Sequence, residues 1–451
     1  MSWAKAVPPR AWGTKEVIPI MSANPVLSLC ALPRDAVVLF ITRFTRLFAY
    51  GALSVVLVFY LVSLGLSAAQ VGLLLTLTLT GDIVISLLLT TRADRFGRRR
   101  ILITGAILMA GAGIAFASTR NLLFLIIAGT IGVISPSGHE VGPFLSIEQA
   151  ALSHVVPARS RTEVFAWHTL VGSVAAALGT FCGGAAAGLA QRTSLSSAGS
   201  YRVVVLLYAA LGIALAFLFL CLSSSTEVAA GTTGAGAAAS RNDFLGVGHS
   251  RSTVLKLSSL FALDAFGGGF VVQSFAAYWF YLRFGAPPAK LGVIFFWANI
   301  LAGISALFAS RLATRIGLVR TMVVTHLPSN VLLILVPLMP NLTLAVIMLL
   351  VRFSISQMDV PTRQSYTMAV VRPEERSAAG GITGVARTAG AAISPIFAGF
   401  LFSRPLLIDV PFFVAGMLKI AYDLVLYRQF ASVQPPEEAE FIADLRLPVK
   451  D

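Results

Sequence analysis

The sequence has little charge and little cysteine, and each shortage excludes a class of protein. Charged residues make up 12% of the 451 residues, whereas hydrophobic residues make up 57%. This balance excludes an ordinary soluble domain and makes a lipid bilayer the expected solvent. The three cysteines, Cys30, Cys182 and Cys221, match no zinc or redox spacing. We therefore predict neither a disulfide framework nor a metal site.

The sequence also lacks the reactive motifs of enzymes and ATP-driven pumps. His139 and Glu140 begin an H-E pattern, but the second histidine of the H-E-x-x-H zinc motif is missing. Asp82 follows Thr80-Gly81, but the glycine that begins the G-x-G-D pattern of intramembrane proteases is replaced by Leu79. No glycine-rich loop ends in Gly-Lys-Ser or Gly-Lys-Thr. The sequence predicts no enzyme and no cofactor.

Basic residues are in excess, and their positions decide what the excess means. Lysine and arginine number 34 against 20 acidic residues, a net charge of +14 that by itself could indicate nucleic-acid binding. The clustered arginines, however, lie in connections that follow even-numbered apolar runs: Arg92 to Arg100, Arg159 and Arg161, Arg311 to Arg320, Arg372 and Arg376. By the positive-inside rule these connections and both termini are cytoplasmic. We expect no nucleic-acid partner.

Twelve apolar runs are long enough to cross a bilayer as helices, which takes about 20 residues. They lie near 38–63, 69–91, 101–118, 122–153, 163–189 and 202–222, and then near 256–282, 289–310, 321–339, 341–368, 378–402 and 408–427. A stretch rich in glycine, alanine and serine separates the two sets. We predict an all-α membrane protein with an arm (1–35), a six-helix bundle (36–222), a cytoplasmic linker (223–255), a second six-helix bundle (256–428) and a tail (429–451).

The two halves repeat each other at one constant offset. The motif at 65–72 recurs at 285–292, and the same register pairs further landmarks: Arg95 with Arg315, Gly97 with Gly317, Arg100 with Arg320 and Asn121 with Asn341. In transporters built from two such repeats, the substrate site lies at the repeat interface near the middle of the bilayer.

The motif at 90–100, Thr-Thr-Arg-Ala-Asp-Arg-Phe-Gly-Arg-Arg-Arg, resembles a loop motif of the major facilitator superfamily, G-x-x-x-D-R-x-G-R-R, with Thr90 in place of the first glycine. The resemblance extends over residues 36–428. It implies a secondary transporter with two six-helix bundles related by a pseudo-repeat, and a cytoplasmic gate formed by Asp94, Arg95, Gly97 and Arg98. The motif does not indicate the cargo.

Charges within the apolar runs mark candidate functional sites, because each costs about 2.5 to 3.5 kcal/mol to insert. Arg46 and Asp82 lie at matching depths, roughly 12 to 14 Å from the cytoplasmic ends of the first two runs. We predict that they form a buried ion pair. Lys419 and Asp423, four residues apart, are predicted to pair on one helix face.

The fourth run is the most informative, because two prolines and two glycines interrupt it around ionisable side chains. Such a break is tolerated only where protein or a water-filled cavity satisfies the backbone. The tenth run repeats proline, a charge and glutamine in matched order. From these two runs and two further helices we predict a substrate and proton cavity lined by His139, Glu140, Glu148, Asp264, Asp359, Arg363 and Arg387.

We expect a monomeric, multi-pass protein of the plasma membrane that moves a small organic anion or zwitterion by alternating access. Proton coupling is expected to run through Glu140 or Glu148. His168 and His326 are interpreted as packing residues. Two alternatives stay open: a drug/proton antiporter, and a receptor or scaffold that keeps the fold without moving cargo. The expected partners are a small-molecule substrate, protons and the lipid bilayer.

Overall fold

The computed structural model describes residues 32–140, 142–156, 161–223, 226–227, 247–372 and 375–431; for residues 91–95, 161–163 and 377 it describes the backbone alone. Most of the predicted arm, linker and tail therefore lies outside the described residues. The first half contains α2 (Arg34–Ser63), α3 (Ala68–Phe96), α4 (Arg98–Ser118), α5 (Leu122–Ile131), α6 (Phe144–Val155), α7 (Arg161–Ala190) and α8 (Ser197–Leu220).

The second half repeats this order. It contains α9 (Arg251–Gly269), α10 (Gln273–Phe284), α11 (Pro288–Ile316), α12 (Leu318–Leu335), η3 (Val336–Leu338), α13 (Leu342–Phe353), α14 (Asp359–Ala369), α15 (Arg376–Phe402), η5 (Pro405–Leu407) and α16 (Val410–Phe430). Ten described helical stretches are long and apolar enough to cross a membrane, and the expected fourth and tenth spans are each divided into two shorter helices. The predicted two-bundle fold of about twelve spans is confirmed.

The residues that repeat in the sequence form the same turns and helix caps in both halves. Gly97 and Gly317 have φ of 94° and 87°, a conformation that favours glycine, and each forms the turn between two consecutive helices. Asn121 and Asn341 cap α5 and α13 by accepting hydrogen bonds from backbone N–H groups. The repeat therefore encodes the same turns and helix starts in each half.

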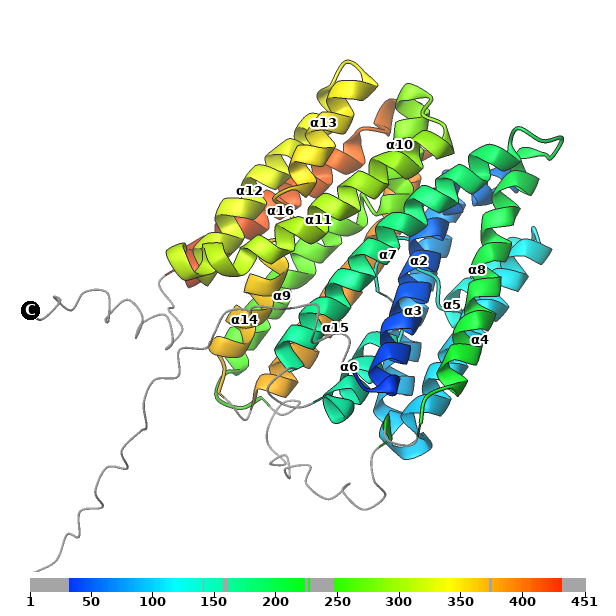
Figure 1. The fold of residues 1–451 in the computed structure, drawn as a ribbon. Helices are drawn as coiled ribbons and strands as arrows, with labels where there is room; N and C mark the ends of the chain where they lie inside the picture. Colours follow the sequence, from blue (N-terminus) through cyan, green and yellow to red (C-terminus); the bar gives the residue numbers. More distant parts are fainter. Residues whose placement is uncertain are drawn as a thin grey trace, which may run out of the picture.

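The two halves lie side by side and meet along two helix pairs, α7 with α11 and α3 with α15 (Figure 1). Glycines allow both pairs to approach closely. A methyl group on Gly72 would lie 2.8 Å from the Cα of Gly399, and one on Gly184 would lie 2.8 Å from the Cα of Gly292. Both approaches are near the ends of the helices that carry the connections at 63–68 and 190–197. The halves are therefore closed together at that end.

The predicted gate lies at the opposite end of α3. The helix continues to Phe96, so the backbone of Asp94 and Arg95 is helical and does not form a loop. The structure describes only the backbone of these two residues. Gly97 forms the turn, and the buried Arg98 begins α4. The carboxylate of Glu227 accepts hydrogen bonds from the backbone N–H groups of Arg98 (2.7 Å) and its neighbour at 99 (3.1 Å). An acidic group at a helix N-terminus stabilises that end of the helix.

Candidate functional site

The fourth span is interrupted between α5 and α6, as predicted. Described residues 132–140 and 142–143 are not helical, and Gly138 and Gly142 have φ of 73° and 81°. The hydroxyl of Ser135 donates to the backbone carbonyl of His139 (2.7 Å) and so satisfies one of the carbonyl groups that the helix would have used. We refer to these described residues as the α5–α6 connection.

Glu140 in this connection and Glu148 in α6 meet two arginines of α2. Arg46 binds Glu148 in a bidentate pair, with Nη1–Oε1 at 2.6 Å and Nη2–Oε2 at 2.8 Å, and neither side chain is exposed. Arg46 Nη2 also donates to Glu140 (3.0 Å), as does Nη1 of Arg43 (2.6 Å). The hydroxyl of Thr42 donates to Glu148 (3.1 Å). Two arginines and two glutamates thus form a compact cluster without net charge.

This cluster corrects the predicted pairing of Arg46 with Asp82. Among the described residues, Arg46 forms its ion pairs with Glu140 and Glu148. Asp82 is buried in α3, where it accepts a long hydrogen bond (3.4 Å) from Ser86. Depth along the helices was estimated from the sequence, but the direction in which each side chain points around its helix was not, and that direction selects the partner.

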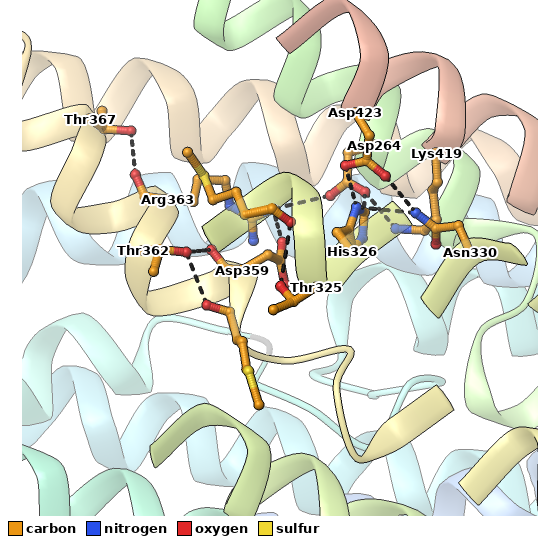
Figure 2. A network of polar contacts seen from close by, with 12 residues as sticks. Asp264, Thr325, His326, Asn330, Asp359, Thr362, Arg363, Thr367, Lys419 and Asp423 are labelled. Atoms are coloured by element: carbon orange, nitrogen blue, oxygen red, sulfur yellow. Dashed lines mark hydrogen bonds and ion pairs between the residues drawn. The ribbon is translucent and has the colours of Figure 1, made fainter. Parts of the chain in front are cut away.

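A second cluster lies in the other half and is centred on Asp264 of α9 (Figure 2). Lys419 of α16 donates to one carboxylate oxygen (2.5 Å), and Arg363 of α14 donates to the other (3.1 Å). The same Nη1 of Arg363 also bonds Asp359 (2.9 Å), one turn earlier in α14. Three helices that are distant in sequence are joined here by charge-assisted hydrogen bonds.

His326 of α12 extends the cluster toward α16. Its Nε2 lies 3.6 Å from Asp264, and its Nδ1 lies 2.8 Å from Asp423, which also accepts from Asn330 (3.0 Å). This arrangement corrects the predicted i,i+4 pair, because Lys419 bonds Asp264 and Asp423 bonds His326. His326 was interpreted as a packing residue, and a lone histidine in an apolar run gave no signal of two carboxylate neighbours.

A cavity of about 280 Å³ adjoins the second cluster and reaches across to the α5–α6 connection. Its volume is close to the lower end of the usual range for ligand pockets, about 300 to 1,000 Å³, which suits a small solute. The charged side chains of its wall are Asp264, Arg352, Arg387 and Lys419. The other polar side chains of the wall are those of Ser137, His139, Gln273 and Gln357.

The predicted cavity residues divide between three places. His139, Asp264 and Arg387 line the cavity; Asp359 and Arg363 belong to the second cluster, which contacts the cavity through Asp264 and Lys419; Glu140 and Glu148 belong to the cluster of the first half. The prediction missed Arg352 and Gln273. Arg352 is a charge inside the tenth apolar run, so the rule that identified the other charges could have found it.

The cavity wall carries more positive than negative charge. Among the described residues of the wall, the one carboxylate is Asp264, which is already engaged by Lys419 and Arg363. Arg352 and Arg387 have no carboxylate within ion-pair distance among the described residues, and the Nε atom of each is buried without a hydrogen-bond partner. Two guanidinium groups therefore face the cavity without an acidic partner in the part of the chain that the structure describes.

The halves also touch through polar groups beside the cavity. Nε2 of Gln273, at the start of α10, donates to the hydroxyl of Ser54 in α2 (2.6 Å), and Asn299 of α11 donates to the Gln273 carbonyl (3.1 Å). The backbone N–H of Ser274 donates to the carbonyl of Pro136 in the α5–α6 connection (3.2 Å). The interrupted fourth and seventh spans are thus bonded to each other.

Comparisons with known proteins agree with this architecture. Residues 39–395 match the family model described as Major Facilitator Superfamily. The membrane protein YJR124C of Saccharomyces cerevisiae is 31% identical over 425 residues, which cover 89% of this chain and 95% of the relative.

Two solved structures are similar in fold. The nucleoside transporter NupG is 12% identical with a TM-score of 0.70, over 88% of this chain and 100% of that one. The human organic anion transporter MFSD10 is 17% identical with a TM-score of 0.59, over 87% and 99%. At these identities the two structures indicate the fold alone.

Proposed function

Because this chain belongs to the Major Facilitator Superfamily and is a multi-pass membrane transporter, we propose that it moves a small organic anion, coupled to protons, by alternating access. The observation that carries the proposal is the cationic wall of the cavity, in which Arg352 and Arg387 have no acidic partner among the described residues. Both arginines are half-buried, and the buried Nε atom of each has no hydrogen-bond partner among the described residues, so their charges are costly to leave unpaired. An anionic cargo would remove that cost by supplying the missing partner.

The type of cation favours a carboxylate or a similar planar or tetrahedral anion. A guanidinium presents several N–H donors in a fixed fork that matches the two oxygens of such a group. Lys419 adds a third donor on the same wall, and its bond to Asp264 (2.5 Å) leaves the ammonium with further protons to donate. A zwitterion is accommodated by the same proposal, because Asp264 is an acceptor for an amino group.

The structural neighbours support the fold and leave the choice of cargo to the cavity. MFSD10 is an organic anion transporter, whereas NupG, with the higher TM-score, is a nucleoside transporter. One fold therefore serves cargoes of different charge. For this chain the anion is proposed because of its own arginines.

The buried carboxylates motivate proton coupling. Ionisable side chains inside a membrane are costly and commonly belong to substrate or proton pathways. Acidic groups of this kind occur in both halves here, with Asp82 and Glu148 in the first and Asp264 and Asp359 in the second. We further propose that the protein is a monomer of the plasma membrane. We also propose that both termini are cytoplasmic, and the arginine-rich connections after even-numbered spans support this orientation.

The test is uptake by proteoliposomes of a panel of labelled monocarboxylates, dicarboxylates, amino acids and neutral sugars, with and without a pH gradient. We expect uptake of at least one anionic compound, stimulated by the gradient, and loss of most of it in Arg352→Gln and Arg387→Gln. Arg404→Gln is the matched control, because Arg404 is exposed and does not line the cavity.

Each alternative gives a different result in the same experiment. Gradient-driven efflux of lipophilic cations without anion uptake would indicate a drug/proton antiporter and contradict the proposal. Binding without flux of any compound would indicate a receptor or scaffold.

A further inference from the structure

The acidic side chains of the first half differ in whether they form an ion pair with a basic side chain. Glu148 lies against Arg46, and Glu140 lies against both Arg46 and Arg43. Asp82 is only 6% exposed, yet no lysine, arginine or histidine among the described residues lies within 4.0 Å of it. Asp82 is thus a buried acidic group that forms no ion pair in the described part of the chain.

The surroundings of Asp82 are polar, and none of the side chains that the structure describes there is positively charged. The hydroxyl of Ser86, on the same helix, donates to it at 3.4 Å, and the backbone N–H of Gly142 points at it from the α5–α6 connection. The titratable groups that face it are Tyr50 of α2, Tyr208 of α8 and Glu140 of the connection. Tyr208 donates its hydroxyl proton to the carbonyl of Val133.

These surroundings distinguish Asp82 chemically from the two glutamates. A carboxylate that accepts several hydrogen bonds from arginine is held in its charged form, whereas an isolated buried carboxylate is costly and is relieved by binding a proton. The protonated form becomes a hydrogen-bond donor, so its bond to the N–H of Gly142 changes from charge-assisted to neutral. Proton binding at Asp82 would therefore directly change the hydrogen bond that the α5–α6 connection donates to this side chain.

The same connection reaches the cargo cavity and the arginine cluster. His139 and Ser137 line the cavity, while Glu140, the next residue, bonds Arg43 and Arg46. Within a few residues, the connection thus contacts the cavity, the arginines of the first cluster and the carboxyl group of Asp82. Gly138 and Gly142 lie on either side of His139 and Glu140, and both have a positive φ, a conformation that favours glycine.

We propose that Asp82 is the proton-binding residue of the transporter and that the α5–α6 connection transmits its protonation state to the cargo cavity. This inference rests on the proposed proton coupling and changes the residue that carries it, because the sequence alone favoured Glu140 or Glu148. The two glutamates instead serve as fixed charges that hold α2 against the fourth span.

The first test needs no cargo. Infrared difference spectra of the purified protein between acidic and alkaline pH report the C=O stretch of buried protonated carboxyl groups. We expect Asp82→Asn to remove a band that the wild type shows and that Glu148→Gln keeps. A band that survives in Asp82→Asn would overturn the proposal, and a band that disappears in Glu140→Gln but not in Asp82→Asn would assign the proton to Glu140.

The second test uses whichever labelled carboxylate of the panel the wild type accumulates. Asp82→Asn should lower its pH-driven accumulation by about tenfold, a usual size for a coupling between two sites. Exchange of the same carboxylate across the membrane without a gradient should continue, which shows that the variant is folded. Accumulation that still follows the gradient in Asp82→Asn would refute the inference.

The two failures can be told apart. If the wild type moves no anion of the panel, or moves it without regard to pH, the proposed function fails, and the infrared spectra still test Asp82. If the wild type couples to protons and Asp82→Asn does so equally, only the inference fails.

Discussion

Arg46 and Glu148 form a fully buried bidentate ion pair although 102 residues separate them in the chain. The guanidinium also lies over the ring of Phe144, with its Cζ 4.6 Å from the ring centroid. Ionic and cation–π contacts thus fix α2 against α6, the second part of the interrupted fourth span. The pair therefore attaches the second part of this span directly to α2.

Removing one member of this pair should destabilise the protein more than removing both. Arg46→Leu leaves Glu148 without its bidentate partner, and Glu148→Leu leaves Arg46 with Glu140 alone, so each single variant gives the buried cluster a net charge. Breaking a buried pair costs about 3 to 5 kcal/mol, whereas the double variant avoids part of that cost. Thermal unfolding in detergent measures the three variants. Arg46→Leu combined with Asp82→Leu is the control and should be additive, because these two residues are not bonded. Additivity in the Arg46/Glu148 cycle would contradict the assigned pair.

Lys419 should be energetically coupled to Asp264 and not to its helix neighbour Asp423. The Nζ of Lys419 bonds Asp264 at 2.5 Å, whereas Asp423 bonds His326 and Asn330. Double-mutant cycles with Lys419→Met, Asp264→Asn and Asp423→Asn should give a coupling of about 0.5 to 3 kcal/mol for the first pair and a smaller one for the second. The reverse order would restore the i,i+4 pair predicted from the sequence.

Gly138→Ala should weaken the contact between the two halves. The residue has φ of 73°, and an added methyl group would lie 3.0 Å from the Ser54 hydroxyl and 3.2 Å from Nε2 of Gln273, the two groups that bond across the halves. The positive φ alone costs about 1 to 2 kcal/mol for a residue with a Cβ.

Gly384→Ala provides the matched control for this substitution. Gly384 lies in α15, has no positive φ and has open space where its Cβ would stand, so alanine should be tolerated or stabilising. Thermal unfolding midpoints of both variants test the prediction. Equal midpoints for Gly138→Ala and the wild type would show that the contact is dispensable.

Glu375 accepts hydrogen bonds from the residues at the start of α9 and makes the free energy of unfolding depend on pH. The side chain of Ser250 and the backbone N–H groups of Gly248, His249 and Ser250 donate to its carboxylate, and these bonds lower the pKa of Glu375 from 4.5 to about 2. A depressed pKa means that the folded protein binds the proton less readily than the unfolded chain. The contribution to stability is therefore complete above pH 4.5 and is lost as the pH falls toward 2.

Glu375→Gln measures this contribution. The variant should unfold at a lower temperature than the wild type near neutral pH, and the difference should shrink as the pH falls below about 4.5, where the wild-type carboxylate begins to lose its advantage. Thermal unfolding from about pH 7 to about pH 3 follows the trend. A difference that stays constant over this range would contradict the role of the charged carboxylate.

The helical plan of the molecule could be predicted from the sequence because it depends on neighbouring residues. A run of about 20 apolar residues predicts a span wherever it lies in the chain. The interruption of the fourth span could be predicted for the same reason, since Pro136 and Pro143 act on the helix that contains them. The repeat of Gly97 and Asn121 at 317 and 341 likewise records local turns and caps.

The charges inside the predicted spans were located from the sequence but paired incorrectly. Arg46, Asp82, Lys419 and Asp423 were identified because any charge inside an apolar run is exceptional. Their partners depend on the rotation of each helix about its own axis and on which helices become neighbours. Those quantities are set by packing over the whole bundle, such as the glycine contacts between α3 and α15, and not by the residues next to each charge.

The sequence by itself thus determined that this is a helical membrane protein of two similar halves with a broken fourth span, because insertion into lipid and helix breaking are local in the chain. Only the tertiary structure decided that Arg46 holds Glu148, that Asp82 is left without a cation among the described residues, and that the cavity has a cationic wall. Each of these facts requires side chains from several helices to meet, and the geometry of that meeting is fixed only when the helices pack.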